Sequence, residues 1–298
     1  MTQKERLAMA EEEMYIYSGI LFHNQNFAEG NREQIQYDFS CPEFVELKEK
    51  YALEKIAGRG SDFQRSKRLL HYLAPRLAHS TWYDNHIPFN ALALLEYSLN
   101  NPEQGINCLN KSKILEECCL ALGIYARRVF IMPYSPYDFD NHVVTEIFDR
   151  ERKKWIMLDP TTDGYFVDEN KTPLSLLEMR ERFAKAEFVT FVSSTDRLRD
   201  LNRLREKHME DNAYICKNLF YFIVDQECRF DDSDHCLRFC PAHYSIKENN
   251  IGNTRFRLKN LPEEQETFRE RLRNHLEWLE SSEERPITDL EMLAMPPC

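Results

Sequence analysis

The segment Asn107-Cys108-Leu109-Asn110-Lys111 begins the stretch of sequence on which the fold and the chemistry depend. Asparagine is a favoured N-cap residue, so it places Cys108 at the first position of a helix that stops at Gly123. The unpaired backbone N–H groups and the dipole of a helix N-terminus favour negative charge. Both effects favour a thiolate, the nucleophilic form of cysteine, and the same N–H groups suit an oxyanion. Cys108 is therefore the candidate nucleophile.

The residues after this helix have strand character. β-forming residues occupy 128–132, 142–149 and 154–159, and the charged tetrapeptide 150–153 joins the last two runs. Two strands with so short a connection predict an antiparallel hairpin. Helices are predicted before this region, with leucines at helical spacing after Asp62 and an apolar stretch over 89–99.

The hairpin predicts a histidine–carboxylate pair. If the turn centres between residues 150 and 151, His142 lies directly opposite Asp159 and on the same face of the sheet. The carboxylate then accepts from one imidazole nitrogen and leaves the other as a base. The alternative is a structural His–Asp pair. A one-residue slip would separate the two side chains, and Asp163 or Asp168 could then orient the histidine.

Four motifs in chain order resemble those of the transglutaminase-like superfamily, and they lie within residues 89–183. They are GINC at 105–108, LALGIYARRV at 120–129, NHVVTE at 141–146 and WIMLDPT at 155–161. The resemblance implies a papain-like α+β core whose nucleophile helix packs on an antiparallel sheet. It also implies that Cys108 is the nucleophile, His142 the base and Asp159 the orienting residue, and that no metal or organic cofactor is required.

The motifs depart from the family pattern next to the expected substrate cleft. Val143 and Val144 follow the histidine where relatives often have a small residue and tryptophan, and Asn107 separates the usual glycine–hydrophobic pair from the cysteine. We expect Asn107 or the indole N–H of Trp82 to contribute to an oxyanion hole or to line the cleft, with a core role as the alternative for Trp82. The resemblance points to an uncharacterised bacterial branch, and the superfamily includes transglutaminases, peptide and amide hydrolases, and inactive members.

The chain is predicted to form one α+β domain. A mostly helical N-terminal region covers residues 1–85, and the transglutaminase-like core covers 86–190. Residues 191–298 supply a long helix from Thr195, two strands and an amphipathic helix that complete the same domain. The last helix carries apolar residues from Phe268 to Leu279 on one stripe, which predicts docking on the core or, alternatively, a dimer contact.

Composition excludes several classes of partner. The chain of 298 residues carries 39 basic and 50 acidic side chains, a formal charge of −11, which disfavours nucleic acid and anionic membranes. Its 8 glycines argue against glycine-rich phosphate loops. The sequence shows no apolar leader and no run long enough for a membrane span, so we expect a cytoplasmic protein with reduced thiols. The expected substrate is a peptide, a protein or a small amide, and the oligomeric state stays open.

The other cysteines carry weaker signals. Cys118 and Cys119 lie within the nucleophile helix, where a core role is expected. A zinc site is the alternative for a C-terminal group, although its spacing lacks paired Cys-x-x-Cys motifs. That group comprises Cys228, Cys236, Cys240 and His243.

Three functions follow from these patterns. The first is a thiol enzyme that attacks an amide or a related acyl group. The second is a catalytically silent transglutaminase-like module that binds a peptide or partner protein, with a cleft blocked by side chains such as Tyr83 or Tyr134. The third is a metal-binding protein that uses the C-terminal cysteines.

Overall fold

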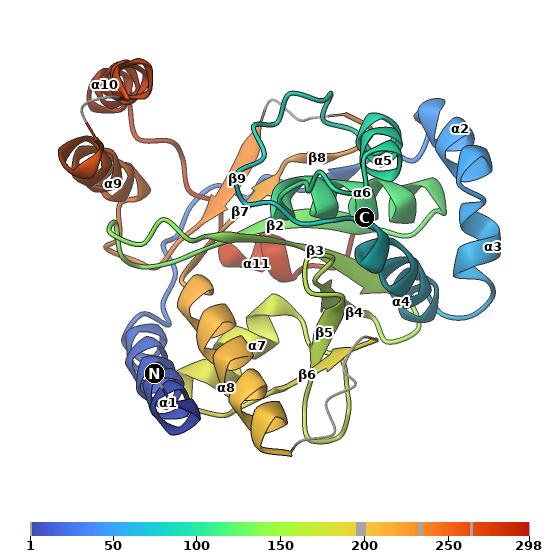
Figure 1. Ribbon diagram of the computed structural model, residues 1–298, viewed down its shortest axis with the longest axis horizontal. Coiled ribbons are helices and arrows are strands. Elements are labelled where there is room, and N and C mark those ends of the chain that lie inside the picture. Colours follow the sequence, from blue (N-terminus) through green and yellow to red (C-terminus); the bar gives the residue numbers. More distant parts are fainter. Residues whose placement is uncertain (1, 195–200, 232–234, 263–264, 298) are drawn as a thin grey trace.

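A five-stranded antiparallel sheet lies at the centre of the computed structural model, which describes residues 2–194, 201–231, 235–262 and 265–297 (Figure 1). The strand order is β4–β3–β2–β7–β9. The strands are β2 (Ala126–Met132), β3 (His142–Asp149), β4 (Lys154–Leu158), β7 (Tyr221–Asp225) and β9 (Cys236–Phe239). The mixed α+β class predicted from the sequence is confirmed. Two strands of this central sheet come from the C-terminal third of the chain.

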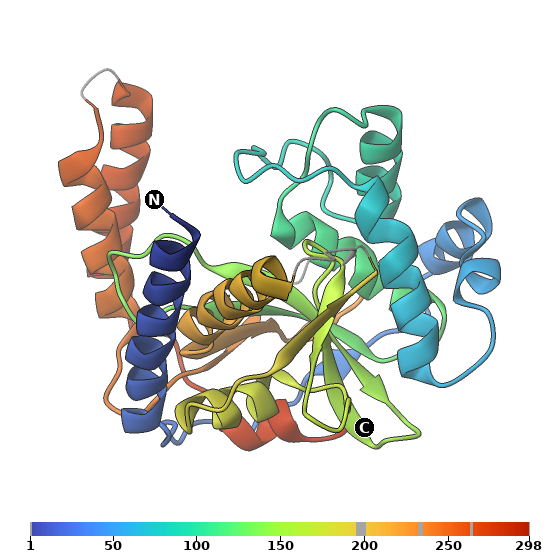
Figure 2. The ribbon, with the colours of Figure 1, turned by 60° about the horizontal axis from the view of Figure 1, so that its bottom comes forward.

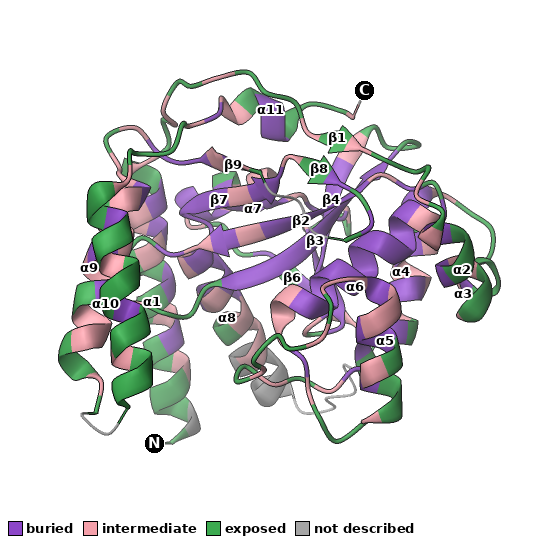
Figure 3. Ribbon diagram, turned by 90° about the horizontal axis from the view of Figure 1, so that it is seen from above, coloured by how far each residue is buried: buried purple, intermediate pink, exposed green. Residues whose placement is uncertain are grey.

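One face of the sheet is covered by α6 (Cys108–Ala121), which packs on β3 and β2 (Figure 3). Residues 110–120 of this helix are all buried, because other helices surround the side that faces away from the sheet. These helices are α2 (Glu43–Lys50), α4 (Asp62–Leu73), followed by a short 3₁₀ turn (Ala74–Arg76), and α5 (Ala91–Asn100). The short helix α3 (Leu53–Ala57) packs on α4 and α2. The nucleophile helix is thus held inside the fold along most of its length.

The opposite face carries a second core, built on α1 (Gln3–His23), α7 (Leu176–Ala184) and α8 (Leu201–Asn218). Side chains of a strand alternate between the two cores. Ile147 of β3 belongs to the core around α6, whereas Val144 of the same strand belongs to the second core. The predicted start of the long helix, at 195–200, lies outside the described residues.

Smaller elements complete the molecule. The segment 160–172 contains β5 (Gly164–Val167), which pairs with β6 (Thr190–Ser193). β1 (Gln36–Tyr37) and β8 (Glu227–Cys228) form a short parallel pair. Figure 2 shows α9 (Ile246–Asn260) and α10 (Glu266–Ser281) projecting together from the main body. α11 (Leu290–Ala294) closes the chain.

The amphipathic stripe of α10 packs on α9, and Leu272 and Leu279 are its buried residues.

Among the described residues, every helix falls short of the length and apolar content that crossing a membrane requires.

Candidate active site

The fold brings the three predicted residues to the ends of three neighbouring elements. Cys108 is the first residue of α6, His142 is the first residue of β3, and Asp159 directly follows β4. Since α6 packs on β3 and β3 pairs with β4, these ends meet at one edge of the fold. The predicted helix start at Cys108 and the predicted strand start at His142 are both confirmed.

The predicted hairpin register is wrong by two residues. Asp149 pairs with Lys154 and Thr145 with Leu158, so the turn centres one residue later than expected. The turn comprises residues 150–153, and its last residue, Lys153, has a positive φ of 54°. Asp159 is therefore diagonal to His142 rather than directly opposite. Because the shift in pairing is an even number of residues, both side chains still lie on the same face.

The histidine–carboxylate pair nevertheless forms. The His142 Nε2 and Asp159 Oδ2 atoms are 2.9 Å apart, and both residues are buried. The other carboxylate oxygen, Oδ1, accepts from the backbone N–H of Thr161 at 2.8 Å. The backbone of Asp159 exchanges two hydrogen bonds with Gly164. The carboxylate is thus fixed from two sides, and Nδ1 is the ring nitrogen left for another partner.

The Cys108 thiol is a neighbour of the His142 ring and contributes to its ionisation. Burial lowers the pKa of His142, but the Asp159 carboxylate and Cys108 more than offset this effect and raise the pKa to about 10. For Asp159, burial opposes ionisation, while His142 and the Thr162 and Thr161 donors hold the carboxyl pKa below its ordinary value. The pair is an imidazolium and a carboxylate at neutral pH.

This ionisation predicts a specific loss of stability in base. An unfolded histidine releases its proton near pH 6.5, whereas folded His142 holds it to about pH 10. The imidazolium therefore contributes its full stability below pH 6.5 and loses it as the pH rises through 10, at about 1.4 kcal/mol per pH unit in between. Urea unfolding at pH 7, 8 and 9 should show this decline. His142→Gln should lack it, and parallel declines in both proteins would contradict the assignment.

Asn107 holds the start of the nucleophile helix. Its Oδ1 accepts from the backbone N–H of Asn110 at 3.2 Å, which is the predicted N-cap bond. Its Nδ2 donates to Oδ1 of Asn85 at 3.1 Å. Both ends of the amide are therefore engaged in positioning the helix. The backbone N–H groups at the first turn, those of Cys108 and Leu109, remain the donors suited to an oxyanion.

The structure excludes the core alternative for Trp82. The indole is 93% exposed, so Trp82 is not a core residue. It lies in the segment 80–87, which approaches the nucleophile helix through Asn85 and through the backbone bond from Ser80 to Ile106. An oxyanion role for the indole has no support among the contacts of the described residues.

Tyr214 is a neighbour of the site that the sequence did not reveal. Its ring lies edge-on to the His142 ring, with 5.6 Å between the centroids, and its hydroxyl donates to Asp140 at 3.4 Å. Burial and the negative charges of Asp140 and Asp159 raise the pKa of Tyr214, so the ring stays neutral. The residue comes from α8, more than seventy positions beyond the histidine, and its role depends on tertiary packing alone.

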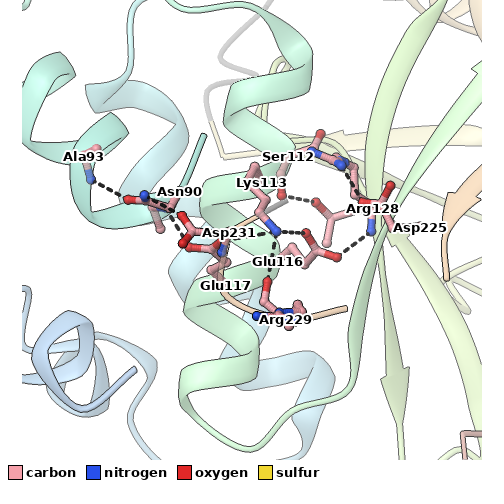
Figure 4. Close-up of polar contacts among 12 residues, drawn as sticks. Asn90, Ala93, Ser112, Lys113, Glu116, Glu117, Arg128, Asp225, Arg229 and Asp231 are labelled. Carbon is pink, nitrogen blue, oxygen red and sulfur yellow. Dashed lines mark hydrogen bonds and ion pairs between the residues drawn. The ribbon is translucent and has the colours of Figure 1, made fainter. Parts of the chain in front are cut away.

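A buried polar network anchors the nucleophile helix to its surroundings (Figure 4). The Ser112 hydroxyl donates to the Val143 carbonyl at 2.8 Å, and Thr145 donates to the Ser112 carbonyl at 3.1 Å. These two bonds join α6 directly to β3, the strand that begins at His142. The spacing between Cys108 and His142 is therefore set by contacts between the helix and the strand.

The second half of the helix is held by charged groups (Figure 4). Glu117 accepts from the backbone N–H groups of Ala91 and Asp231 at 2.7 and 3.1 Å. Burial raises the pKa of Glu117 to about 7. Arg128 of β2 pairs with Asp225 of β7. These groups have a structural function, because they join α6 and the sheet to the segments around them.

The structure engages the other acidic candidates elsewhere. Asp163 binds His71, with 2.8 Å between Oδ1 and Nδ1, and accepts from Ser194. Asp168 accepts from backbone N–H groups in its own turn, including that of Thr172 at 2.7 Å. Asp159 is thus the member of this group that orients His142.

The residues of the alternative zinc site are not arranged around a common centre. Cys228 is buried in the β1–β8 pair, the Cys236 thiol lies by Asp225, and the Cys240 thiol lies by the Tyr244 carbonyl. His243 is exposed. Among the described residues no group of three or more His, Cys, Asp or Glu side chains is arranged to hold a metal ion.

The remaining candidates lie in separate contacts. Cys118 and Cys119 are fully buried, and burial raises the pKa of both thiols. Tyr83 packs on His86 and Tyr97, and Tyr134 packs on Phe220 and Tyr244, as shown by the ring contacts of these residues. Cys108 differs from the two core thiols in being partly exposed.

Comparisons of the chain with protein-family models, with curated proteins and with solved structures gave no match, so the site is defined by its own geometry.

Proposed function

We propose that the protein is a cysteine-dependent enzyme that transfers the acyl group of an amide or peptide bond through Cys108, His142 and Asp159. The observation that carries this proposal is the position of the His142 ring. One nitrogen is 2.9 Å from the Asp159 carboxylate, and a neighbouring, partly exposed thiol, that of Cys108, helps to raise the pKa of the same ring. Nucleophile, base and orienting group in this order are the arrangement of acyl transfer.

The reaction follows from these positions. The Cys108 thiolate attacks the carbonyl carbon, a C–S bond forms, and the charge moves to the carbonyl oxygen. When the intermediate collapses, the C–N bond breaks and the leaving amine takes a proton from His142. Water or a second amine then attacks the thioester and gives a proton to His142, and the C–S bond breaks to restore the thiolate. Asp159 keeps the imidazole oriented throughout.

The surroundings of the site support a transglutaminase-like, papain-like core. The nucleophile stands at the N-terminus of a buried helix, and this helix packs on the antiparallel strand that begins with the base. The first-turn N–H groups are suited to hold the oxyanion. The proposed substrates are peptides, proteins or small amides, with hydrolysis by water or transfer to an amine as the two outcomes of one thioester.

Acylation by p-nitrophenyl acetate tests this function. The thiolate displaces p-nitrophenolate, and one acetyl group should appear on Cys108 in the intact mass and in peptide maps. The group should leave on treatment with hydroxylamine, as a thioester does. Cys108→Ala should carry no acetyl group, because the nucleophile is missing, and His142→Gln should acquire it at least about a hundredfold more slowly.

Cys41 provides an internal comparison for the same experiment. It is also partly exposed, but burial and the Asp38 carboxylate raise the pKa of its thiol, so it should remain unmodified. Acetylation of Cys41 and Cys108 at similar rates, or no thioester on Cys108, would contradict the enzyme and favour the silent binding module.

A further inference from the structure

A buried cation beside the candidate nucleophile has no anionic partner. Lys111 follows Cys108 by three residues on α6, so the two side chains are neighbours on the surface of the helix. Lys111 is only 2% exposed. Within the ranges that the structure describes, its ammonium group forms no ion pair and no hydrogen bond with another side chain. Lysine side chains are almost never buried unless they are paired, so this lysine differs from an ordinary structural residue.

Lys113 shows how the same helix accommodates a paired lysine. Its Nζ lies 3.4 Å from the Glu116 carboxylate and 3.1 Å from that of Glu117, and it donates to the Arg229 carbonyl at 3.0 Å (Figure 4). Two carboxylates and a carbonyl satisfy this cation completely. Lys111 has nothing equivalent, although it is buried to the same degree.

The ammonium group of Lys111 is coupled electrostatically to residues of the candidate site. Burial lowers the pKa of Lys111, and the negative charges of Asp159 and Cys108 oppose this change. Burial and then the charges of Lys111 and His142 lower the pKa of His79. The ammonium group is therefore within electrostatic reach of the nucleophile, the orienting carboxylate and His79.

The other groups of the site leave one negative charge for this cation. The titratable groups coupled to Lys111 are Cys108, Asp159 and His79, and these are coupled in turn to His142 and Tyr214, with Asp140 beside Tyr214. His79 and Tyr214 are neutral at pH 7, since the pKa of His79 is lowered and that of Tyr214 is raised. Asp159 is paired with His142, and Asp140 with Lys217. Only a thiolate at Cys108 adds an anion within this set.

We propose that Lys111 is the counter-ion of the negative charge that forms at Cys108, first on the thiolate and then on the carbonyl oxygen of the tetrahedral intermediate. The inference rests on the proposed acyl transfer and adds a charge-stabilising residue to it. In the attack, the sulfur electron pair forms the C–S bond and the carbonyl π pair moves to oxygen, so the charge stays near Lys111. A fixed cation in a buried site stabilises both charged states but not the neutral thioester.

Replacement of Lys111 by methionine separates this role from a structural one. The readout is the alkylation of Cys108 by iodoacetamide between pH 5 and 9, in which the thiolate forms a C–S bond and iodide leaves. In Lys111→Met the rate at pH 6 should fall about tenfold or more, and the pH of half-maximal rate should rise by at least about one unit. The melting temperature should stay constant or rise, because an unpaired buried charge is removed.

Three controls belong to this experiment, all measured below the melting temperature of every variant. Lys111→Arg keeps the cation and should retain most of the rate at pH 6. Lys113→Met should lower the melting temperature, since it leaves two buried carboxylates without a cation, but should leave the pH profile of Cys108 unchanged. The anionic reagent iodoacetate should lose more of its rate than iodoacetamide in Lys111→Met, because the cation also attracts the reagent.

The outcomes separate this inference from the proposed function. An unchanged pH profile in Lys111→Met would overturn the role of Lys111, as would migration of the acetyl group from Cys108 to the Lys111 amine. By contrast, a wild-type Cys108 that is alkylated at pH 6 in a Lys111-dependent way, but never acylated, would support the counter-ion and contradict only the acyl-transfer function.

Discussion

Asp159→Asn is expected to slow acylation of Cys108 by roughly 10²- to 10⁴-fold while the protein remains folded. The carboxylate accepts from His142 with Oδ2 and from the Thr161 N–H with Oδ1. An asparagine that keeps its oxygen on the Thr161 N–H must turn its NH₂ group toward Nε2 of His142. Nε2 must then accept, so the proton moves to Nδ1, the nitrogen that should receive the thiol proton.

The same change should alter the ionisation of the histidine. Without the carboxylate, burial dominates and the pKa of His142 should fall from about 10 to below its ordinary value. The stability that the imidazolium contributes between pH 6.5 and 10 should then disappear. Burst kinetics with p-nitrophenyl acetate measure the acylation rate, and NMR of the imidazole C–H signals measures the histidine pKa.

A second histidine–carboxylate pair in the chain provides a matched control. The His71 Nδ1 and Asp163 Oδ1 atoms are 2.8 Å apart, close to the 2.9 Å of the first pair, and Asp163 is buried. Asp163 has a positive φ of 58°, which asparagine tolerates. Asp163→Asn should therefore leave the acylation of Cys108 within about twofold of wild type, since no proton is transferred through this pair. Equal losses in Asp159→Asn and Asp163→Asn would indicate a general loss of stability rather than a lost orienting residue.

Local signals in the sequence, together with the four motifs in chain order, identified the three candidate residues. An N-cap asparagine placed Cys108, and the charged tetrapeptide between two β-rich runs placed His142 and Asp159 on one face. The face of the sheet on which a side chain lies depends only on whether a shift in register is odd or even. The predicted face is therefore correct, although the predicted register is wrong by two residues. The exact pairing was predicted wrongly, because a four-residue turn with Lys153 in the left-handed region has no strong sequence signature such as Asn-Gly.

The surroundings of the site could not be predicted in this way. Tyr214 reaches His142 from a distant helix, and the exposure of Trp82 depends on how a loop leaves the surface. The sequence alone does not single out Lys111, because a lysine in a helix is ordinarily exposed to solvent. Its lack of a partner emerges only when the whole environment of the side chain is known. Long-range packing, rather than local pattern, thus determines which charges surround the thiol.

The largest stability effect is expected from Arg127, which joins the sheet to two helices. Its guanidinium donates to the Glu146 carboxylate at 3.1 and 2.6 Å and to the Leu293 carbonyl at 2.8 Å, and it lies 3.7 Å from the centre of the Trp155 ring. Glu146 also accepts from the backbone N–H of Leu176, at the start of α7, at 2.9 Å. The ion pair is completely buried within the fold.

Arg127→Met should therefore lower the free energy of unfolding by about 3–5 kcal/mol, because it leaves the Glu146 carboxylate buried without a cation. Urea denaturation at pH 7 measures this loss. The double variant Arg127→Met/Glu146→Leu should be more stable than Arg127→Met alone, since it removes the uncompensated charge. It should remain below wild type, because the Leu293 carbonyl and the Leu176 N–H lose their partners at about 1–3 kcal/mol each. Additive losses in the double variant would show instead that the two side chains stabilise the fold independently, through packing on Trp155 and through the start of α7.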